Sequence, residues 1–566
     1  MSGSDARHDV RLLHDCRVPL RDGLTLSADV YLPLAKGPFP TIAQWTPYES
    51  TRDRFVSWGA FYAQRGYAAV VIDVRGRYES EGTFTAYTRD GEDAFDSLEW
   101  VSSREWCNGR VGTWGRSYGA IVQWQLSPLG HPAVACMAPH VIMDDYFGDC
   151  HYVGGAFQLA LSLGAALIWS TSIGVVTGQS AGALMLNDRV LRHLPLLDLD
   201  VQAIGREVTC WREWHAHPVD DEFWQSIRHR TEAMTVPVFQ QCGWYDAYAG
   251  STMRTFQGLD GRVRQKLLVG PWSHEEEFTR VVGGHDFGAA ASRVIREDDL
   301  RWYDQWLKEL DTGVLAEPPI SLFVMGANRW RHESEWPLPG TELTPWFLSS
   351  GGRANTLAGD GVLTVDPPGS GEPADTYDYD PANPVPTVGG NNSILTMMQS
   401  AVEPFGPGPV DQRPLERRDD VLCYTSAPLE DDVEVTGPVE AVLYAASSAR
   451  DTDFVVRLCD VQPDGRALFL CEGILRARHR NGLDRVDFLE PGEAAEYRIR
   501  MYPTSNLFRR GHRIRVDVTS SSFPRFSRNL NTGEDVATGT RMEIARQTVL
   551  HTSEYPSHVL LPIVLS

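Results

Sequence analysis

The sequence has few cysteines and no close pair of them. Nine cysteines, an odd number, are spread over 566 residues, and no C-x-x-C pair occurs. We therefore expect neither a disulfide framework nor a zinc site of paired cysteines. The run His-Ala-His at 215–217 is too short to form a metal site, so no metal and no cofactor is expected. Free thiols fit a reducing, cytoplasmic location.

Positive charge is also scarce. Lysine and arginine number 52 against 75 aspartate and glutamate residues, which gives a formal net charge of −23. Such an acidic surface repels nucleic acid and anionic membranes, so we expect neither as a partner. The first residues, MSGSDARHDV, contain no apolar run, and we expect no signal peptide.

One segment lacks charged residues altogether. No Asp, Glu, Lys or Arg occurs from Cys150 to Asn187, but glycine, serine, threonine and glutamine residues interrupt the apolar ones. A bilayer span needs about 20 predominantly apolar residues. We therefore expect buried helices of a soluble protein here rather than a membrane span.

Tryptophan is absent from the C-terminal part of the chain. All 17 tryptophans lie between Trp45 and Trp346, and a segment rich in glycine, proline and aspartate follows. Beyond residue 420 come short alternating runs with many β-branched residues, separated by turns, which are typical of a β-sandwich or jelly roll. We place a boundary near residue 346 and predict a jelly-roll domain over 346–566.

The N-terminal part alternates predicted strands and helices, such as the helix at 91–102. This alternation predicts an α/β fold, with a parallel sheet covered by helices on both faces. It stops between residues 145 and 231, where the chain is helical or irregular and rich in aromatic residues. We expect 145–231 to be a helical cap inserted into a catalytic domain of residues 1–144 and 232–345.

The pattern G-x-S-x-G occurs twice, around Ser117 in VGTWGRSYGA and around Ser180 in VVTGQSAGAL. It is typical of a nucleophile elbow, a tight strand-to-helix turn that exposes a catalytic serine. Ser117 follows the next predicted strand after the helix at 91–102, where a doubly wound sheet requires it. Ser180 lies in the inserted segment, without alternating strands around it. We predict that Ser117 is the nucleophile.

A catalytic serine needs a histidine base and an acid that orients the histidine. In α/β-hydrolases the order along the chain is serine, acid, histidine, each on a loop after a strand. Asp246 directly follows the predicted strand at 237–242, and His274 follows the one at 266–270, with one helix between them. We predict that Asp246 is the acid and His274 the base.

Longer segments resemble the family of cocaine esterases and X-prolyl dipeptidyl-peptidases, the S15-type or CocE/NonD serine hydrolases. The matching segments occur in the family's order along nearly the whole chain: TPYES (46–50), DVRGRYESEG (73–82), NGRVGTWGRSYGA (108–120), GWYDAYAGSTMRTF (243–256), GPWSH (270–274), YDPANPVPTVGG (379–390) and SSSFPRFSRNLNTG (520–533). The resemblance implies an α/β-hydrolase core, an inserted helical cap and a C-terminal jelly roll.

The resemblance also implies functional residues. It gives Ser117, His274 and Asp246 the roles of nucleophile, base and acid. It further implies an oxyanion hole made by the Tyr48 hydroxyl, from the TPY turn, and by the backbone N–H of Tyr118. Both groups are hydrogen-bond donors that can stabilise a developing alkoxide.

Members of the family divide among esterases, X-prolyl peptidases, α-amino acid ester hydrolases and acylases. The amino acid ester hydrolases carry carboxylates two and three places after the triad aspartate, where this chain has Tyr248 and Ala249. Glu275–Glu277 could bind an ammonium group, although a solvated acidic loop is the simpler interpretation. Trp244, Tyr248 and Trp45 could line an apolar substrate pocket.

We therefore predict a serine esterase for small esters with apolar or aromatic acyl groups. The alternatives are an X-prolyl dipeptidyl-peptidase acting on short peptides, or an amidase or acylase, each with the same triad. An alternative of another class is a ligand-binding protein that acts through its jelly roll. The lack of tryptophan there favours a structural role for that domain. The oligomeric state is left open, a homodimer included.

Overall fold

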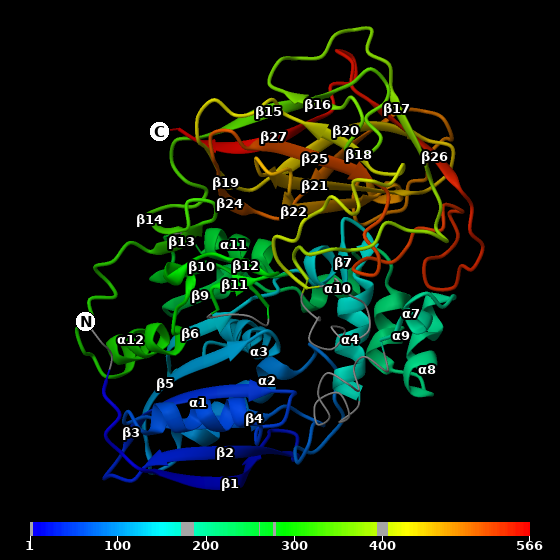
Figure 1. Cartoon of the computed structure of the whole chain (residues 1–566). Coiled ribbons are helices and arrows are strands. Elements are labelled where there is room, and N and C mark those ends of the chain that lie inside the picture. Colours follow the sequence, from blue (N-terminus) through cyan, green and yellow to red (C-terminus); the bar gives the residue numbers. More distant parts are fainter. Residues whose placement is uncertain (1–3, 171–185, 260, 275–278, 393–405, 566) are drawn as a thin grey trace.

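The computed structural model describes residues 4–170, 186–259, 261–274, 279–392 and 406–565. Within these residues the chain forms two large sheets and a helical region beside them (Figure 1). The N-terminal sheet extends from the bottom to the middle of Figure 1, the C-terminal sheet lies at the top, and the helical region lies at the right.

The first sheet has ten strands in the order β1-β2-β4-β3-β5-β6-β9-β10-β13-β14. Its strands are β1 (Val10–Pro19), β2 (Thr25–Pro33), β3 (Phe39–Thr46), β4 (Ala68–Asp73), β5 (Cys107–Arg116), β6 (Val134–His140), β9 (Val238–Tyr245), β10 (Gln265–Ser273), β13 (Ile320–Val324) and β14 (Arg329–Glu333). The strands from β4 to β13 are parallel, and antiparallel strands complete both edges. The predicted α/β fold with a parallel sheet is confirmed.

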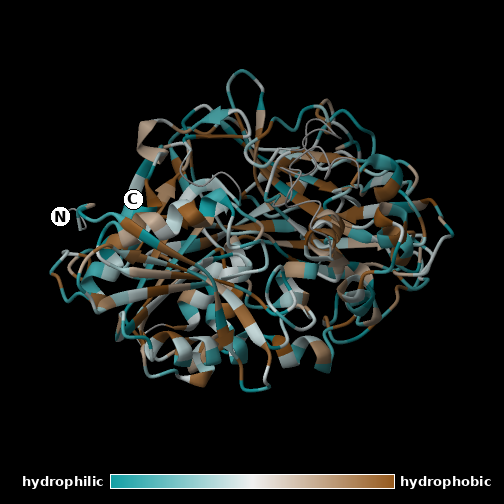
Figure 2. Ribbon diagram, turned by 90° about the horizontal axis from the view of Figure 1, so that it is seen from below, coloured by the Kyte–Doolittle hydropathy of each residue, from teal (hydrophilic) through white to brown (hydrophobic). Residues whose placement is uncertain are grey.

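Helices cover both faces of this sheet. The helices are α1 (Asp53–Ala63) and α12 (Ile295–Leu307) on one face, and α2 (Asp90–Ser102), α3 (Tyr118–Leu126) and α11 (Ala249–Gly258) on the other. In α2 the buried Ala94, Leu98 and Val101 recur at helical spacing, as the sequence pattern predicts. In Figure 2 the strands carry brown, apolar residues, while many loops at the periphery are teal.

The region between β6 and β9 holds short helices and a small hairpin. Its elements are the hairpin β7 (Tyr152–Val153) and β8 (Ala156–Phe157), and the helices α4 (Leu159–Ser170), α7 (Asp188–Leu191), α8 (Leu199–Ile204), α9 (Thr209–Ala216) and α10 (Glu222–Ile227). Trp211, Trp214 and Trp224 are buried among them. None of the helices within the described ranges is long and apolar enough to cross a bilayer.

The second sheet has thirteen strands, all in the C-terminal part. They are β15 (Thr341–Ser349), β16 (Val362–Thr364), β17 (Asp375–Tyr379), β18 (Leu422–Thr425), β19 (Val433–Gly437), β20 (Glu440–Ser447), β21 (Asp453–Val461), β22 (Ala467–Arg476), β23 (Ala495–Arg500), β24 (Thr504–Phe508), β25 (Arg513–Thr519), β26 (Ala545–Leu550) and β27 (His558–Val564). Because β15 pairs with β27 from Thr341 onward, this sheet begins before the boundary expected near residue 346.

Candidate active site

Ser117 lies at a sharp turn between β5 and α3. Its backbone has φ 55° and ψ −117°, a conformation that non-glycine residues rarely adopt. A Cβ atom at Gly115 would lie 2.4 Å from the carbonyl oxygen of Gly119, and one at Gly119 would lie 3.1 Å from that of Trp45. The two glycines of G-x-S-x-G are therefore required by close backbone contacts, which is the geometry of a nucleophile elbow.

Asp246 and His274 follow neighbouring parallel strands. Tyr245 at the end of β9 pairs with Ser273 at the end of β10, so the next residues of both strands lie close together. His274 Nδ1 is 2.9 Å from Asp246 Oδ2. The Asp246 side chain is fully buried, while that of His274 is 11% exposed. A carboxylate on Nδ1 fixes the ring and leaves Nε2 able to accept a proton.

All three predicted triad residues lie at the carboxyl ends of parallel strands, which is where α/β proteins place their ligand sites. The hydrogen bonds among the described residues include the one from His274 to Asp246 but none between Ser117 Oγ and His274. In unliganded enzymes the hydrogen bond between nucleophile and base is often long and shortens when substrate binds.

The two predicted oxyanion donors come from neighbouring strands. Tyr118 is the first residue of α3, and the first N–H groups of a helix have no partner inside it and carry partial positive charge. Tyr48 follows β3, which pairs with β5, and is half-buried. The guanidinium of Arg54 lies 5.0 Å above its ring. A backbone N–H and a phenol thus reach the same edge of the sheet.

Asp90, at the start of α2, holds the side chain of Tyr118. The Tyr118 hydroxyl donates to Asp90 Oδ2 at 2.8 Å and accepts the backbone N–H of Tyr87 at 3.2 Å. Burial raises the pKa of Asp90 to about 7. The sequence analysis missed Asp90, because nothing in its segment distinguishes it from an ordinary first residue of a helix.

Asn391 connects the C-terminal part to the loop of the predicted acid. Its fully buried side chain donates from Nδ2 to the backbone oxygens of Trp244 at 2.5 Å and Asp246 at 3.2 Å. The sequence analysis missed this residue too, although it directly follows the segment 379–390 that carries the family resemblance. The second half of the chain thereby helps to fix the position of Asp246.

Of the predicted substrate residues, Tyr248 lies beside the base. Its ring meets that of His274 edge to face, with centroids 5.5 Å apart, and its hydroxyl is 3.9 Å from Cys150 Sγ. Burial raises the pKa of the Tyr248 phenol well above its usual value, so the group stays neutral.

Trp244 and Trp45 have contacts that account for their burial by packing. The Trp244 indole donates to the backbone oxygen of Phe323 at 2.8 Å, and its ring lies 6.2 Å from that of Trp336. Trp45 is buried in the core, where its backbone carbonyl lies against Gly119. Both residues support the framework of the site.

The helical region contributes an aromatic residue to the surroundings of the elbow. Trp169, near the end of α4, has its ring centroid 5.2 Å from that of Tyr118 and 6.0 Å from that of Phe84. Aromatic surface therefore packs directly on the residue that follows Ser117. Ser180 and Glu275–Glu277 lie outside the described residues.

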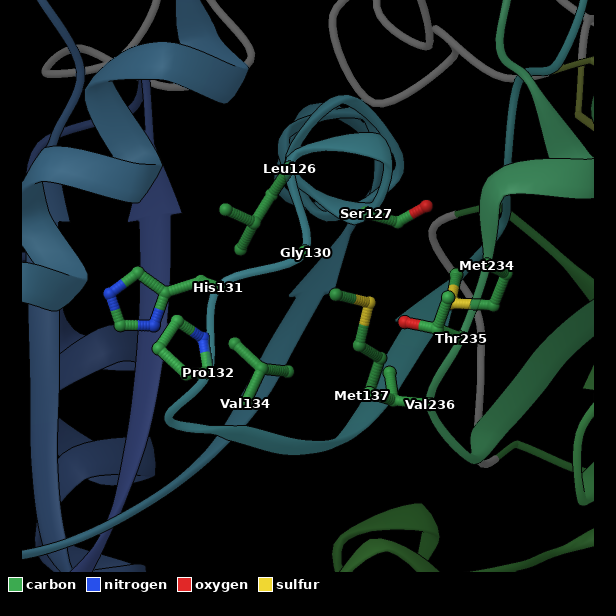
Figure 3. A pocket seen from close by; sticks show the side chains of 10 residues that line it. All are labelled: Leu126, Ser127, Gly130, His131, Pro132, Val134, Met137, Met234, Thr235 and Val236. Atoms are coloured by element: carbon green, nitrogen blue, oxygen red, sulfur yellow. The ribbon is translucent and has the colours of Figure 1, made fainter.

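A separate hollow of about 210 Å³ lies between the end of α3 and the beginnings of β6 and β9 (Figure 3). Leu126 and Ser127 line one side of it, and Met234 and Thr235 lie across from them. The hollow lies near the amino ends of β6 and β9, whereas Ser117 and Asp246 lie at the carboxyl edge of the same sheet. No predicted site residue lines it.

The amino-acid sequence matches two family models. One, described as X-Pro dipeptidyl-peptidase (S15 family), matches residues 22–276. The other, the X-Pro dipeptidyl-peptidase C-terminal non-catalytic domain, matches residues 312–560. The chain is also 39% identical to the cocaine esterase of Rhodococcus sp. (strain MB1 Bresler) over 579 aligned residues, which cover 97% of each chain.

The fold is similar to those of solved hydrolases. An aminopeptidase from the marine sediment archaeon Thaumarchaeota archaeon superposes with a TM-score of 0.86 at 26% identity, over 99% of this chain and 97% of the other. An α-amino acid ester hydrolase gives a TM-score of 0.83 at 25% identity, over 100% and 98%. The similarity extends over both large sheets.

Proposed function

The chain belongs to the S15-type CocE/NonD family of serine hydrolases, which act on esters or peptides, and within it we propose an esterase with Ser117, His274 and Asp246 as its triad. The observation that carries this proposal is the 2.9 Å hydrogen bond from His274 to Asp246, at the same sheet edge as the left-handed turn of Ser117. The order of the three residues along the chain also fits an α/β-hydrolase.

In the proposed mechanism His274 Nε2 takes the proton of Ser117 Oγ as this oxygen attacks the ester carbonyl carbon. The negative charge moves to the carbonyl oxygen, which accepts hydrogen bonds from the Tyr48 hydroxyl and the Tyr118 N–H. When the carbonyl re-forms, His274 protonates the departing alcohol. Water, deprotonated by His274, then attacks the acyl-enzyme and releases the acid.

We propose that the acyl group is apolar or aromatic. Tyr248 and Ala249 occupy the places where amino acid ester hydrolases carry carboxylates, and both are buried. Tyr248 packs on the base and Trp169 on Tyr118, so uncharged aromatic surface flanks the triad from two sides. Such surface favours an uncharged acyl group over an ammonium.

We also propose the division of the chain into a catalytic domain, a cap of residues 145–231 and a jelly roll. The strand β15 favours a start of the jelly roll at Thr341 instead of near residue 346. The hydrogen bonds from Asn391 to the loop of Asp246 support a structural role for the jelly roll beside the site, in place of an independent binding function.

The test combines labelling with a substrate panel. A fluorophosphonate should label the wild-type chain, and peptide mass spectrometry should locate the label on Ser117. Ser117→Ala should abolish both labelling and hydrolysis, while Ser180→Ala, the matched control in the second G-x-S-x-G, should retain both. Label on Ser180 or on no serine would contradict the proposed nucleophile.

The panel consists of p-nitrophenyl esters of apolar and aromatic acids, aminoacyl esters and X-prolyl anilides, each tested with wild type and Ser117→Ala. Faster turnover of aromatic or apolar acyl esters supports the esterase. Preference for the X-prolyl anilides would instead establish the peptidase alternative with the same triad. Preference for aminoacyl esters would contradict the proposed acyl group but not the proposed triad.

A further inference from the structure

A second group of reactive side chains lies inside the C-terminal sheet, far along the chain from the triad. Glu416, Cys459 and Asp517 each offer one ligand atom, a carboxylate oxygen or the sulfur. These three atoms lie within 4.8 Å of one another. Relative exposure is 0% for Glu416 and Cys459 and 1% for Asp517. The three residues come from separate segments, so no short sequence pattern could indicate a metal site.

The strand pairing explains why these side chains meet. Cys459 on β21 lies opposite Arg515 on β25. Asp517 is two residues further along β25 and therefore faces the same side of the sheet as Arg515. Glu416 reaches this face from the turn before β18, where Arg515 Nη1 donates to its Oε2 at 2.5 Å.

Several carboxylate oxygens of the cluster lack a donor. Among the described residues, no hydrogen-bond partner reaches Oδ1 or Oδ2 of Asp517, or Oε1 of Glu416, although all three atoms are buried. A buried polar group without a partner is destabilising, and an ionised one more so. Native proteins rarely leave such groups unpaired.

The nearby arginines direct most of their donors to other groups, although Nη1 of Arg457 is itself buried without a partner among the described residues. Arg457 lies opposite Asp517 in the ladder, but its Nε donates to Glu472 at 3.2 Å and its Nη2 to the Ser521 carbonyl at 3.2 Å. Arg515 is bonded to Glu416 and Thr425. Carboxylate oxygens and a sulfur thus converge on one point, where Arg515 bonds one oxygen of Glu416 and the other carboxylate oxygens have no donor among the described residues. Sulfur accepts hydrogen bonds weakly but ligates soft cations well.

We propose that Glu416, Cys459 and Asp517 bind a divalent cation of the Zn²⁺ type. We assign Cys423 as the fourth donor, because it is buried and lies directly opposite Asp517 in the β18–β25 pairing. Two thiolates and two carboxylates suit tetrahedral Zn²⁺, whereas Mg²⁺ and Ca²⁺ prefer oxygen ligands alone. Each thiol loses its proton to solvent on binding.

The site is closed, so its role is structural. All four side chains are buried, so a substrate cannot reach a cation held between them. The cation ties the turn that carries Glu416 to the strands β18, β21 and β25. It is independent of the proposed esterase, since no hydrogen bond or ion pair within the described ranges joins its ligands to Ser117, Asp246 or His274.

The first test measures metal content of the full-length chain produced in zinc-supplemented medium and washed with a mild chelator. Elemental mass spectrometry should find about one Zn²⁺ per chain. Cys459→Ser and Asp517→Asn should lose most of it. Cys471→Ser is the matched control, because Cys471 is also fully buried, on the adjacent β22, but packs in the main core and outside the cluster.

The second test uses Co²⁺ to establish thiolate ligation. Wild-type chain produced with Co²⁺ should show a sulfur-to-cobalt charge-transfer band, which Cys471→Ser keeps and Cys459→Ser loses. Wild-type protein that holds neither Zn²⁺ nor Co²⁺ would overturn the proposal, and the carboxylates would then share a proton or a water. Equal metal loss in Cys471→Ser would overturn it as well.

Discussion

At the residue scale, Tyr48 and Tyr118 bring two kinds of hydrogen-bond donor to the carboxyl edge of the first sheet. The N–H of Tyr118 is fixed by the helix that it begins, and its side chain is anchored on Asp90. The donor of Tyr48 is a side-chain hydroxyl, so a single atom can be removed without changing the backbone. Tyr48 is therefore the residue at which the proposed oxyanion hole can be tested most cleanly.

Tyr48→Phe should lower kcat by about 10²–10³-fold, because one oxyanion donor contributes that much to transition-state stabilisation. The KM should change little, since the donor acts mainly on the developing charge. Steady-state kinetics on the best ester of the panel provide the measurement, with circular dichroism to show that the fold is intact.

Tyr31→Phe is the matched control for Tyr48→Phe. The Tyr31 hydroxyl is buried and has no hydrogen-bond partner among the described residues, so its removal should leave kcat unchanged. A Tyr48→Phe enzyme with wild-type kcat would mean that another group takes the place of the phenol.

At the element scale, the turn between β5 and α3 depends on two glycines in close backbone contact. The contact is much tighter at Gly115, where a Cβ would lie 2.4 Å from a carbonyl oxygen, than at Gly119, where it would lie 3.1 Å away. A clash at Gly115 must move either the strand or the helix. Either movement displaces Ser117.

Gly115→Ala should lower the free energy of unfolding by about 1–3 kcal/mol through overpacking. It should also reduce kcat by about 10²-fold or more, because displacements near 1 Å are that costly to catalysis. Gly119→Ala should have smaller effects in both respects. Denaturant unfolding and ester kinetics measure the two quantities.

Gly371→Ala is the control for the elbow glycines. Gly371 is exposed, and a Cβ there meets nothing within 4 Å, so stability should stay within about 0.5 kcal/mol of wild type. If Gly115→Ala behaved like this control, the elbow would tolerate a side chain, and the close contact at Gly115 would matter neither for stability nor for kcat.

At the scale of the whole molecule, one charge network joins three regions of the chain. Arg254 on α11 donates to Asp144 at 2.7 Å and also contacts Asp149, both from the segment that follows β6. Arg500 on β23 of the second sheet donates to Asp149 at 2.7 Å. The first sheet, the helical region and the second sheet thus meet around Asp149.

Arg254→Met should lower the free energy of unfolding by about 1–3 kcal/mol. It leaves Asp144 without its arginine and Asp149 with Arg500 alone, and solvent screening at the partly exposed Arg254 limits the effect. Denaturant unfolding followed by fluorescence provides the measurement. Arg546→Ala, in the exposed pair with Asp378, is the control and should cause no measurable change. Equal stability of both variants would show that the network does not hold the regions together.

The local elements could be predicted from the sequence because their determinants are local. Apolar spacing in α2, alternation in the C-terminal strands and the two glycines around Ser117 all depend on residues close together in the chain. The positions of Asp246 and His274 followed from the same logic, since each directly follows a buried strand. The fold class and the family are confirmed, while the roles of the triad residues stay predictions.

Only the tertiary structure decided which distant residues meet. Trp244 and Trp45 lie near the predicted site in sequence, and in the structure both are buried, with the Trp244 indole bonded to Phe323. Asp90, Asn391 and the ligands of the proposed cation site come from separate segments that tertiary packing brings to their partners. Sequence by itself determines periodicity and turns, because these arise from neighbouring residues. Contacts across the sheets depend on register and packing of the whole chain, which no short pattern contains.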